Sequence, residues 1–189
     1  DLQAAPGWHA DWRIEDRAGL LPAGREAHLR YWDLTVAAEA GTVEQWISTP
    51  KETPFDETWI PAVMLRRRCD TPPLASTFVA IIEPYLDTPT IVSVRRLYVE
   101  TPDGVLCSDA VVGVEVTMTN GARDIWLAGD ALPGEKVLPE MNIRTDAECC
   151  LVRLASDGMP YHAVACHGRV VQIGNLMIAP DAMKDLLVW

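Results

Sequence analysis

Apolar and polar side chains alternate with a period of two along most of this chain. Between positions 28 and 38, Trp32, Leu34 and Val36 occupy every second position, and polar or aromatic residues stand between them. The same alternation recurs in three further segments, at positions 62–69, 91–99 and 110–119. Period-two alternation is typical of β-strands with one covered face. The pattern therefore predicts a protein built mainly from antiparallel strands.

Apolar residues fill both faces of the segment from Ser76 to Tyr85, in contrast to the alternating segments. Such a run is typical of a central strand that is covered on both sides.

The tryptophans fall into a group expected in the core and a group expected at the surface. Three of them stand at alternating apolar positions and are expected in the core, namely Trp32, Trp46 and Trp126. Trp8 and Trp12 precede the first segment with clear alternation and are expected at the surface.

Turn signals separate the expected strands. Asn120-Gly121 stands between the segments 111–119 and 123–128, and Asn-Gly between two alternating segments strongly predicts a hairpin. Three further pairs indicate turns, with the last the weakest: Asp103-Gly104, Asp157-Gly158 and His167-Gly168. Pro50 and Pro54 mark a polar connection. The strands are therefore joined mostly by short loops.

Long stretches of helical periodicity are missing, and the one expected helix is a short one near Pro180–Leu187, where a proline in the first turn is tolerated. About ten or eleven short strands, with turn signals roughly every 8–12 residues, predict an antiparallel β-sandwich. We expect the sandwich to occupy residues 1–130 and a seam to lie at 131–140. Residues 141–189 then form terminal hairpins that either continue the sandwich or make a small sheet of their own.

Composition and charge limit the classes of function. The chain has 189 residues, of which 49% are hydrophobic and 23% are charged, as in ordinary globular proteins. No apolar run approaches the roughly 18 residues of a transmembrane helix. The net charge of -11 repels phosphate backbones and anionic lipid surfaces. We therefore expect neither nucleic acid nor a membrane as a partner.

The start of the chain and the number of its cysteines bear on its origin. The sequence begins at Asp1 without a basic and apolar leader, so we expect a piece of a longer protein. Five cysteines are an odd number for a closed set of disulfides. Most of them are expected to be free and buried. Unpaired cysteines are also compatible with the cytoplasm, so they do not determine the compartment.

Cysteine and histidine side chains are concentrated near the C-terminus, on neighbouring expected strands: Cys149, Cys150, His162, Cys166 and His167. A set of this kind can hold zinc. Cys149 and Cys150, however, point to opposite faces of a strand, and the spacing matches no usual zinc motif. We therefore predict no metal site and no cofactor. The sequence leaves open whether Cys149, Cys150 and Cys166 are free, paired or metal-bound.

Nucleophilic catalysis has little support in the sequence. Cys107 and Ser108 follow a turn, and His28 or His162 could act as a base, but no nucleophile-elbow motif surrounds them. Glycine-rich phosphate-binding loops are also absent from the sequence. No catalytic residue is assigned to this chain.

Arginines provide the candidates for substrate binding, and these are Arg66, Arg68 and Arg95. If their strands are neighbours, their guanidinium groups form a cationic patch that can bind carboxylates in a bidentate manner. The alternative is that Arg66 and Arg68 form cross-strand ion pairs. The carboxylates considered for those pairs are Glu83, Asp70 and Glu100.

The amino-acid sequences of four segments resemble the C-terminal β-sandwich region of heparinase II/III-like polysaccharide lyases. These segments are HLRYWDLT (28–35), TFVAIIEPY (77–85), PTIVSVRRL (89–97) and VVGVEVTMTNGARDIWL (111–127). Phe78 and the triplet Glu83-Pro84-Tyr85 are the most characteristic parts, and the resemblance covers roughly residues 28–130.

The resemblance implies an upstream α/α toroid that packs on this sandwich within a larger bacterial enzyme, periplasmic or secreted. Such enzymes cleave uronate-containing, acidic polysaccharides by β-elimination, with most catalytic groups on the toroid. This piece is then mainly a scaffold. Two other hypotheses stay open: an independent carbohydrate-binding or adhesion-type sandwich, and, with less support, a metal-dependent enzyme that uses the C-terminal cysteines and histidines.

Overall fold

The computed structural model describes residues 2–3, 5–47, 58–129, 134–180 and 184–189. These residues form an all-β protein with sixteen strands and a single short 3-10 helix, Pro139–Met141. The number of strands exceeds the expected ten or eleven mainly because several have only two or three residues, too short to show alternation. Pro50 and Pro54 lie outside the described residues, as does part of the expected seam.

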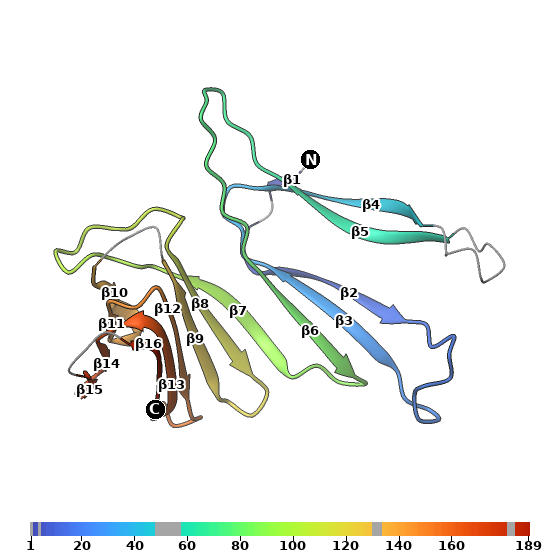
Figure 1. Cartoon of the computed structure of the whole chain (residues 1–189). Coiled ribbons are helices and arrows are strands. Elements are labelled where there is room, and N and C mark those ends of the chain that lie inside the picture. The colour runs from blue at the N-terminus through green and yellow to red at the C-terminus, as the bar shows by residue number, and fades with distance from the viewer. Residues whose placement is uncertain (1, 4, 48–57, 130–133, 181–183) are drawn as a thin grey trace.

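A six-stranded antiparallel sheet and a four-stranded sheet make the C-terminal half a β-sandwich (Figure 1). The larger sheet has the order β16-β13-β12-β9-β8-β7. Its strands are β7 (Ile91–Leu97), β8 (Val112–Met118), β9 (Arg123–Ala128), β12 (Cys149–Leu154), β13 (Pro160–Gly168) and β16 (Lys184–Val188). The smaller sheet contains β10 (Lys136–Leu138), β11 (Ile143–Thr145), β14 (Val171–Ile173) and β15 (Leu176–Ile178).

Alternation along the strands builds the core between these two sheets. In β12, every second side chain is buried, as at Cys150 and Val152. These residues pack with Ile125 and Leu127 of β9 against Ile143 of the smaller sheet. Burial of apolar surface is the main stabilising contribution here. The segments before and after the expected seam therefore share one core, and the C-terminal hairpins continue the sandwich.

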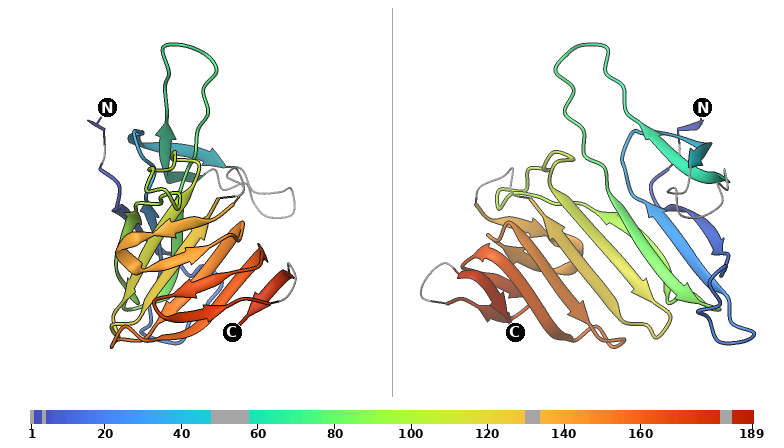
Figure 2. Two further views of the ribbon diagram at one scale, coloured as in Figure 1. Left: turned by 90° about the vertical axis from the view of Figure 1, so that its left-hand side faces the viewer. Right: turned by 45° about the vertical axis from the view of Figure 1, so that its right-hand side comes forward.

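The N-terminal half contributes two three-stranded sheets that diverge from the region where they join the sandwich (Figure 2). One sheet has the order β2-β3-β6, with β2 (Trp8–Ile14), β3 (Ala27–Asp33) and β6 (Ala80–Leu86). The other has the order β1-β4-β5, with β1 (Leu2–Gln3), β4 (Glu39–Ile47) and β5 (Thr58–Arg66). Trp32 and Leu34 pack on Val94, Val114 and Val116 and form a second core.

The predicted turns are mostly confirmed. Gly121 takes a φ of 82° between β8 and β9, and the Oδ1 of Asn120 accepts the amide of Ala122 at 3.0 Å. Asp157-Gly158 joins β12 to β13, with the Gly158 amide bound to the carbonyl of Ala155. His167-Gly168 is not a hairpin turn, because both residues belong to the end of β13. A Cβ on Gly168 would lie 2.7 Å from the Cβ of Ala147, so close packing requires glycine there.

The expected C-terminal helix is wrong in its described part. Lys184–Val188 forms β16, which pairs with β13 through Ala165 and Leu187, among others. So short a segment forms too few internal hydrogen bonds to be a stable helix, whereas strand pairing satisfies its backbone along an existing edge. Residues 181–183 lie outside the described part.

Three expectations about burial are also corrected. β6 is not a central strand covered on both sides. Among the described residues it pairs with β3 alone, and Phe78 before it and Ile82 within it are exposed. Trp32 is in the core, but Trp46 and Trp126 are exposed. Trp8 and Trp12 are half-buried. Alternation predicted which side chains share a face, but it cannot tell whether another layer covers that face.

Replacement of Ile125 by alanine tests the shared core. Ile125 is almost fully buried between the two sheets, so Ile125→Ala is expected to lower the free energy of unfolding by about 2–5 kcal/mol. Val105→Ala, in an exposed turn, is the matched control and should cost less than about 0.5 kcal/mol. Chemical denaturation of both variants measures the difference. Equal midpoints would contradict the packing described here.

Candidate functional site

Four polar side chains gather on one face of the β2-β3-β6 sheet, and we call them the Asp11 cluster: Asp11, His28, Arg30 and Tyr85. Asp11 lies on β2, His28 and Arg30 on β3, and Tyr85 on β6. Strand register brings them together, because Asp11 is opposite Arg30 and His28 is opposite Tyr85. Residues paired in this way point to the same face of a sheet.

Asp11 is the centre of the cluster. Its Oδ2 accepts hydrogen bonds from Arg30 Nε at 2.8 Å and from the Tyr85 hydroxyl at 2.5 Å. Its Oδ1 lies 3.2 Å from His28 Nδ1. An ionised carboxylate only accepts hydrogen bonds, so Nδ1 carries the proton and Nε2 is the acceptor in a neutral His28. That second nitrogen lies 3.8 Å from the Glu26 carboxylate.

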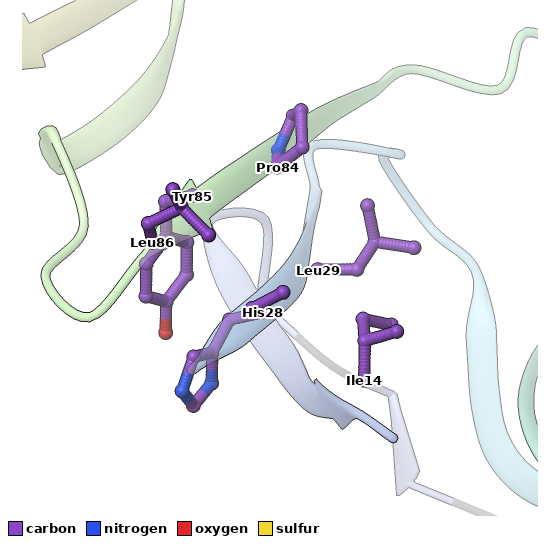
Figure 3. Close-up of a pocket in the computed structure, with 7 residues that line it drawn as sticks. Ile14, His28, Leu29, Pro84, Tyr85 and Leu86 are labelled. Atoms are coloured by element: carbon purple, nitrogen blue, oxygen red, sulfur yellow. The ribbon is translucent and has the colours of Figure 1, made fainter. Parts of the chain in front are cut away.

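Stacking reinforces these hydrogen bonds. The rings of His28 and Tyr85 are 4.8 Å apart and inclined by 7° (Figure 3). The Arg30 guanidinium lies 5.2 Å from the centre of the Tyr85 ring and 5.5 Å from that of Trp32. Cation–π contacts of this kind are favourable. The side chains are therefore held in one arrangement by neighbours on all three strands.

The environment of the cluster shifts two pKa values in opposite directions. Partial desolvation raises the pKa of Asp11, but hydrogen bonds from Tyr85, Arg30 and His28 outweigh it and the pKa is lowered. Desolvation, together with the hydrogen bond to Asp11, raises the pKa of Tyr85. A tyrosine with a raised pKa is a poor general base near neutral pH.

Glu83 connects this cluster to the rest of the fold. Its carboxylate is buried, and Oε1 accepts the amides of Thr90 and Ile91 at 2.7 and 2.8 Å. Oε2 accepts the indole N–H of Trp32 at 3.3 Å and lies 3.9 Å from Arg30 Nη1. Arg30 is thus shared between two carboxylates, Asp11 and Glu83. The cluster therefore offers no excess positive charge for a uronate carboxylate.

A shallow pocket of about 340 Å³ lies at the end of the same sheet (Figure 3). Its lining is mostly apolar and consists of Ile14, Ala27, His28, Leu29, Pro84, Tyr85 and Leu86. The apolar members alternate in sequence with His28 and Tyr85, so most of the lining belongs to the face of the strands opposite the Asp11 cluster. The pocket and the cluster share His28 and Tyr85.

The three arginines proposed from sequence do not meet. Arg66 and Arg68 belong to β5 and the residues after it, whereas Arg95 lies on β7 of a different sheet. Arg66 Nε donates to Glu39 at 2.8 Å, and Arg68 Nε lies 3.4 Å from the same carboxylate. The cross-strand partner is thus Glu39 rather than Glu83, Asp70 or Glu100. Arg95 contacts Glu115 and, at 2.6 Å, Glu140.

The C-terminal cysteines behave as free thiols. Cys149 and Cys166 are opposite each other in the β12–β13 pair, and Cys149 and Cys150 point to opposite faces, as predicted. The expectation that most of the five cysteines are buried is wrong, because only Cys150 is buried and Cys69 is exposed. Burial raises the pKa of the Cys150 thiol to about 12, which makes it unreactive. Within the described chain, no three histidine, cysteine or acidic side chains lie close enough together to hold a metal ion.

The sequence pattern indicates His28 as a candidate base, but it does not indicate Asp11, Arg30 or the hydrogen bond of the Tyr85 hydroxyl. No local motif contains them, because Asp11 and Tyr85 are 74 positions apart. The usable signal was the strand order, since a correct pairing of β2 and β6 with β3 would have placed them on one face. That order is a tertiary property.

Comparisons with known proteins leave the family of this chain undetermined. No protein-family model matches the sequence, and no curated protein matches it. No helix in the described part of the chain is long and apolar enough to cross a membrane. The interpretation of function therefore depends on the surfaces and the contacts described above.

Replacement of Asp11 by asparagine tests the electrostatics of the cluster. Because the pKa of Asp11 is lowered in the folded state, its ionised form stabilises the fold above about pH 4, and this contribution is lost as the pH falls through the folded pKa. Asp11→Asn should therefore be less stable than the unmodified chain at pH 7, and the difference should shrink at pH 3. Urea denaturation at both values measures it, with Asp103→Asn in an exposed turn as control. A difference that does not change with pH would refute this assignment.

Proposed function

We propose that this chain is the β-sandwich part of a larger heparinase II/III-like polysaccharide lyase, which acts on uronate-containing polysaccharides by β-elimination. In this proposal the chain is mainly a scaffold, and an upstream α/α toroid carries most of the catalytic groups. The resemblance of the strand segments to that family supports it. The all-β sandwich fold agrees with it. A periplasmic or secreted location in a bacterium belongs to the same proposal.

The observation that carries the scaffold role is a set of apolar faces that nothing in the described chain covers. No described side chain of β4 or β5 is buried. Trp46, Trp59 and Met64 are exposed on this hairpin. A two-stranded hairpin without a cover is marginally stable in water, and the third strand of this sheet has only two residues. A neighbouring domain that packs here would stabilise the hairpin.

The outer face of the β2-β3-β6 sheet is a second such surface. Ile14, Ile82 and Leu86 are exposed there, and Ile82 retains 64% of its accessible area. The chain as a whole exposes 11978 Å², whereas a compact monomer of 20.8 kDa exposes about 9,000 Å². Large apolar patches on a folded protein typically mark interaction sites. Both surfaces are thus consistent with a module that packs on another domain.

Charge also favours a scaffold over a self-sufficient lyase. An anionic glycan needs cationic groups to bind it and to neutralise the uronate carboxylate. In this chain Arg30, Arg66, Arg68 and Arg95 all contact carboxylates. In this proposal, the cationic site belongs to the upstream toroid rather than to this module.

Lyase assays on two proteins test the proposal. The isolated 189-residue chain is expected to form no unsaturated uronate from alginate or glycosaminoglycans, as followed by ultraviolet absorbance. The complete gene product is expected to form it. Robust product from the isolated chain would overturn the scaffold role. A complete gene product that has no helical domain, or that cleaves no uronate polymer, would overturn the lyase assignment.

A second function, an independent carbohydrate-binding module, is favoured by one specific observation. Trp46 and Trp59 are directly opposite each other on the hairpin, with 52% and 61% of their surfaces exposed. Exposed aromatic rings stack on the apolar faces of pyranose rings. The nearby Glu44 is also exposed, so a neutral glycan suits this surface better than an acidic one.

Affinity electrophoresis in gels that contain neutral or acidic polysaccharides tests this second function. If the hairpin binds sugar, the double variant Trp46→Ala/Trp59→Ala should bind the retarding polysaccharide about tenfold more weakly or not at all. Tyr98→Ala removes an exposed aromatic ring elsewhere and should leave binding unchanged. Absence of retardation of the unmodified chain by every glycan would argue against an independent binding module.

A further inference from the structure

Within the residues that the structure describes, β2 lies at the edge of its sheet, and one side of its backbone is unpaired. In the described chain it pairs with β3 alone, over seven consecutive residue pairs from Trp8 to Ile14 without a bulge. The strand contains no proline and no lysine, and its two charged residues, Asp11 and Arg13, are of opposite sign. Natural proteins usually protect edge strands by charged residues, by proline, by bulges or by a covering segment. Because charges of opposite sign can pair with those of a partner strand, this edge can pair with another strand.

Hydrogen bonds at the ends of β3 show which backbone groups of β2 are available. The Leu34 amide donates to the Val79 carbonyl at 2.8 Å, and these residues flank the pair Asp33–Ala80. Asp33 is therefore in a non-hydrogen-bonded pair with β6, and its own N–H and C=O point toward β2. Its partner Trp8 accordingly bonds to β3.

Hydrogen bonding in an antiparallel pair alternates from one residue to the next. Since Trp8 bonds to β3, Ala10, Trp12 and Ile14 do the same. The N–H and C=O groups of His9, Asp11 and Arg13 consequently point away from β3, toward the free edge. Three donors and three acceptors are therefore arranged as a template for one additional strand.

We propose that this edge pairs with β2 of a second copy of the chain, in an antiparallel register centred on Trp12. In this register Asp11 is opposite Arg13 of the partner subunit, and the reciprocal pair forms by symmetry. Ala10 is opposite the partner's Ile14. The two sheets join into one sheet with the order β6-β3-β2-β2-β3-β6. This inference does not depend on the proposed lyase role, and either can fail without the other.

Charge complementarity selects the register. The two-fold axis between two antiparallel strands of one sheet is perpendicular to that sheet. Because paired residues must point to the same face, the axis passes midway between two copies of the same residue. Centring on Asp11 would place two carboxylates opposite each other, which is unfavourable. Centring on Ala10 would pair Asp11 with the partner's His9, which is weaker than a permanently charged arginine. Centring on Trp12 provides two Asp–Arg pairs.

The side chain of Arg13 is accessible for this contact. It is largely exposed and forms an ion pair with Glu26, which is also exposed, at 3.1 Å. Exposed ion pairs of this kind contribute little to stability. Arg13 can therefore exchange Glu26 for Asp11 of the partner subunit at a small cost in free energy. The Trp12 side chains meet at the axis, in a pair where Cβ atoms approach closely.

Sedimentation equilibrium of the 189-residue chain over a range of concentrations tests the dimer. The unmodified chain and Arg13→Lys should show a reversible monomer–dimer equilibrium. Arg13→Pro removes an amide that points to the free edge and leaves the bonds to β3 intact, and proline is tolerated on such an edge. It should weaken the dimer at least about tenfold. Arg13→Glu keeps the amide but places a carboxylate opposite the partner's Asp11, and should weaken it similarly.

The Arg13→Glu variant keeps the test decisive if the proline variant fails to fold, which circular dichroism would show. Mild oxidation of Trp12→Cys should also yield a disulfide-linked dimer well above the background from Cys69, which is exposed, whereas Ala10→Cys should not. A chain that stays monomeric at high concentration would overturn the proposal. So would a dimer that Arg13→Glu leaves unchanged, because another surface would then form it.

Discussion

The buried carboxylate of Glu83 lies where the β2-β3-β6 sheet meets the six-stranded sheet. It accepts the amides of Thr90 and Ile91 at the start of β7 and the indole N–H of Trp32 on β3. Loss of these acceptors would leave buried donors unpaired, which is costly. Glu83 thus holds the chain at the point where β6 gives way to β7. The packing of Trp32 on Val94 and Val114 depends on this connection.

This arrangement covers the sheets unevenly. One face of the β2-β3-β6 sheet carries the Asp11 cluster and Trp32 and turns toward the second core, whereas the other exposes Ile82 and Leu86. The charges of the Asp11 cluster are compensated within the chain. By contrast, no other described segment covers the exposed apolar side chains of the β4–β5 hairpin and of the outer face of the β2-β3-β6 sheet. These exposed apolar faces are the observations on which the proposed scaffold role rests.

Much of the fold follows from local patterns. Alternation predicted an all-β protein, and Asn120-Gly121 and Asp157-Gly158 predicted the hairpins that join β8 to β9 and β12 to β13. The prediction failed where the decisive contact is distant in sequence. Lys184–Val188 became a strand because the edge of β13 was available to it. Ser76–Tyr85 looked like a central strand, but no sheet in the described chain covers its outer face.

The sequence by itself determined the period of the strands, the positions of several turns and which side chains share a face, because each depends on residues that are neighbours along the chain. Strand order and the pairing of charges were decided by the tertiary structure. Asp11 and Tyr85 come together because β2 and β6 both pair with β3. Arg66 binds Glu39 and not Glu83, Asp70 or Glu100, the partners predicted from the sequence. Such contacts depend on how sheets pack and which edges remain free, and distant residues carry no local signal of either.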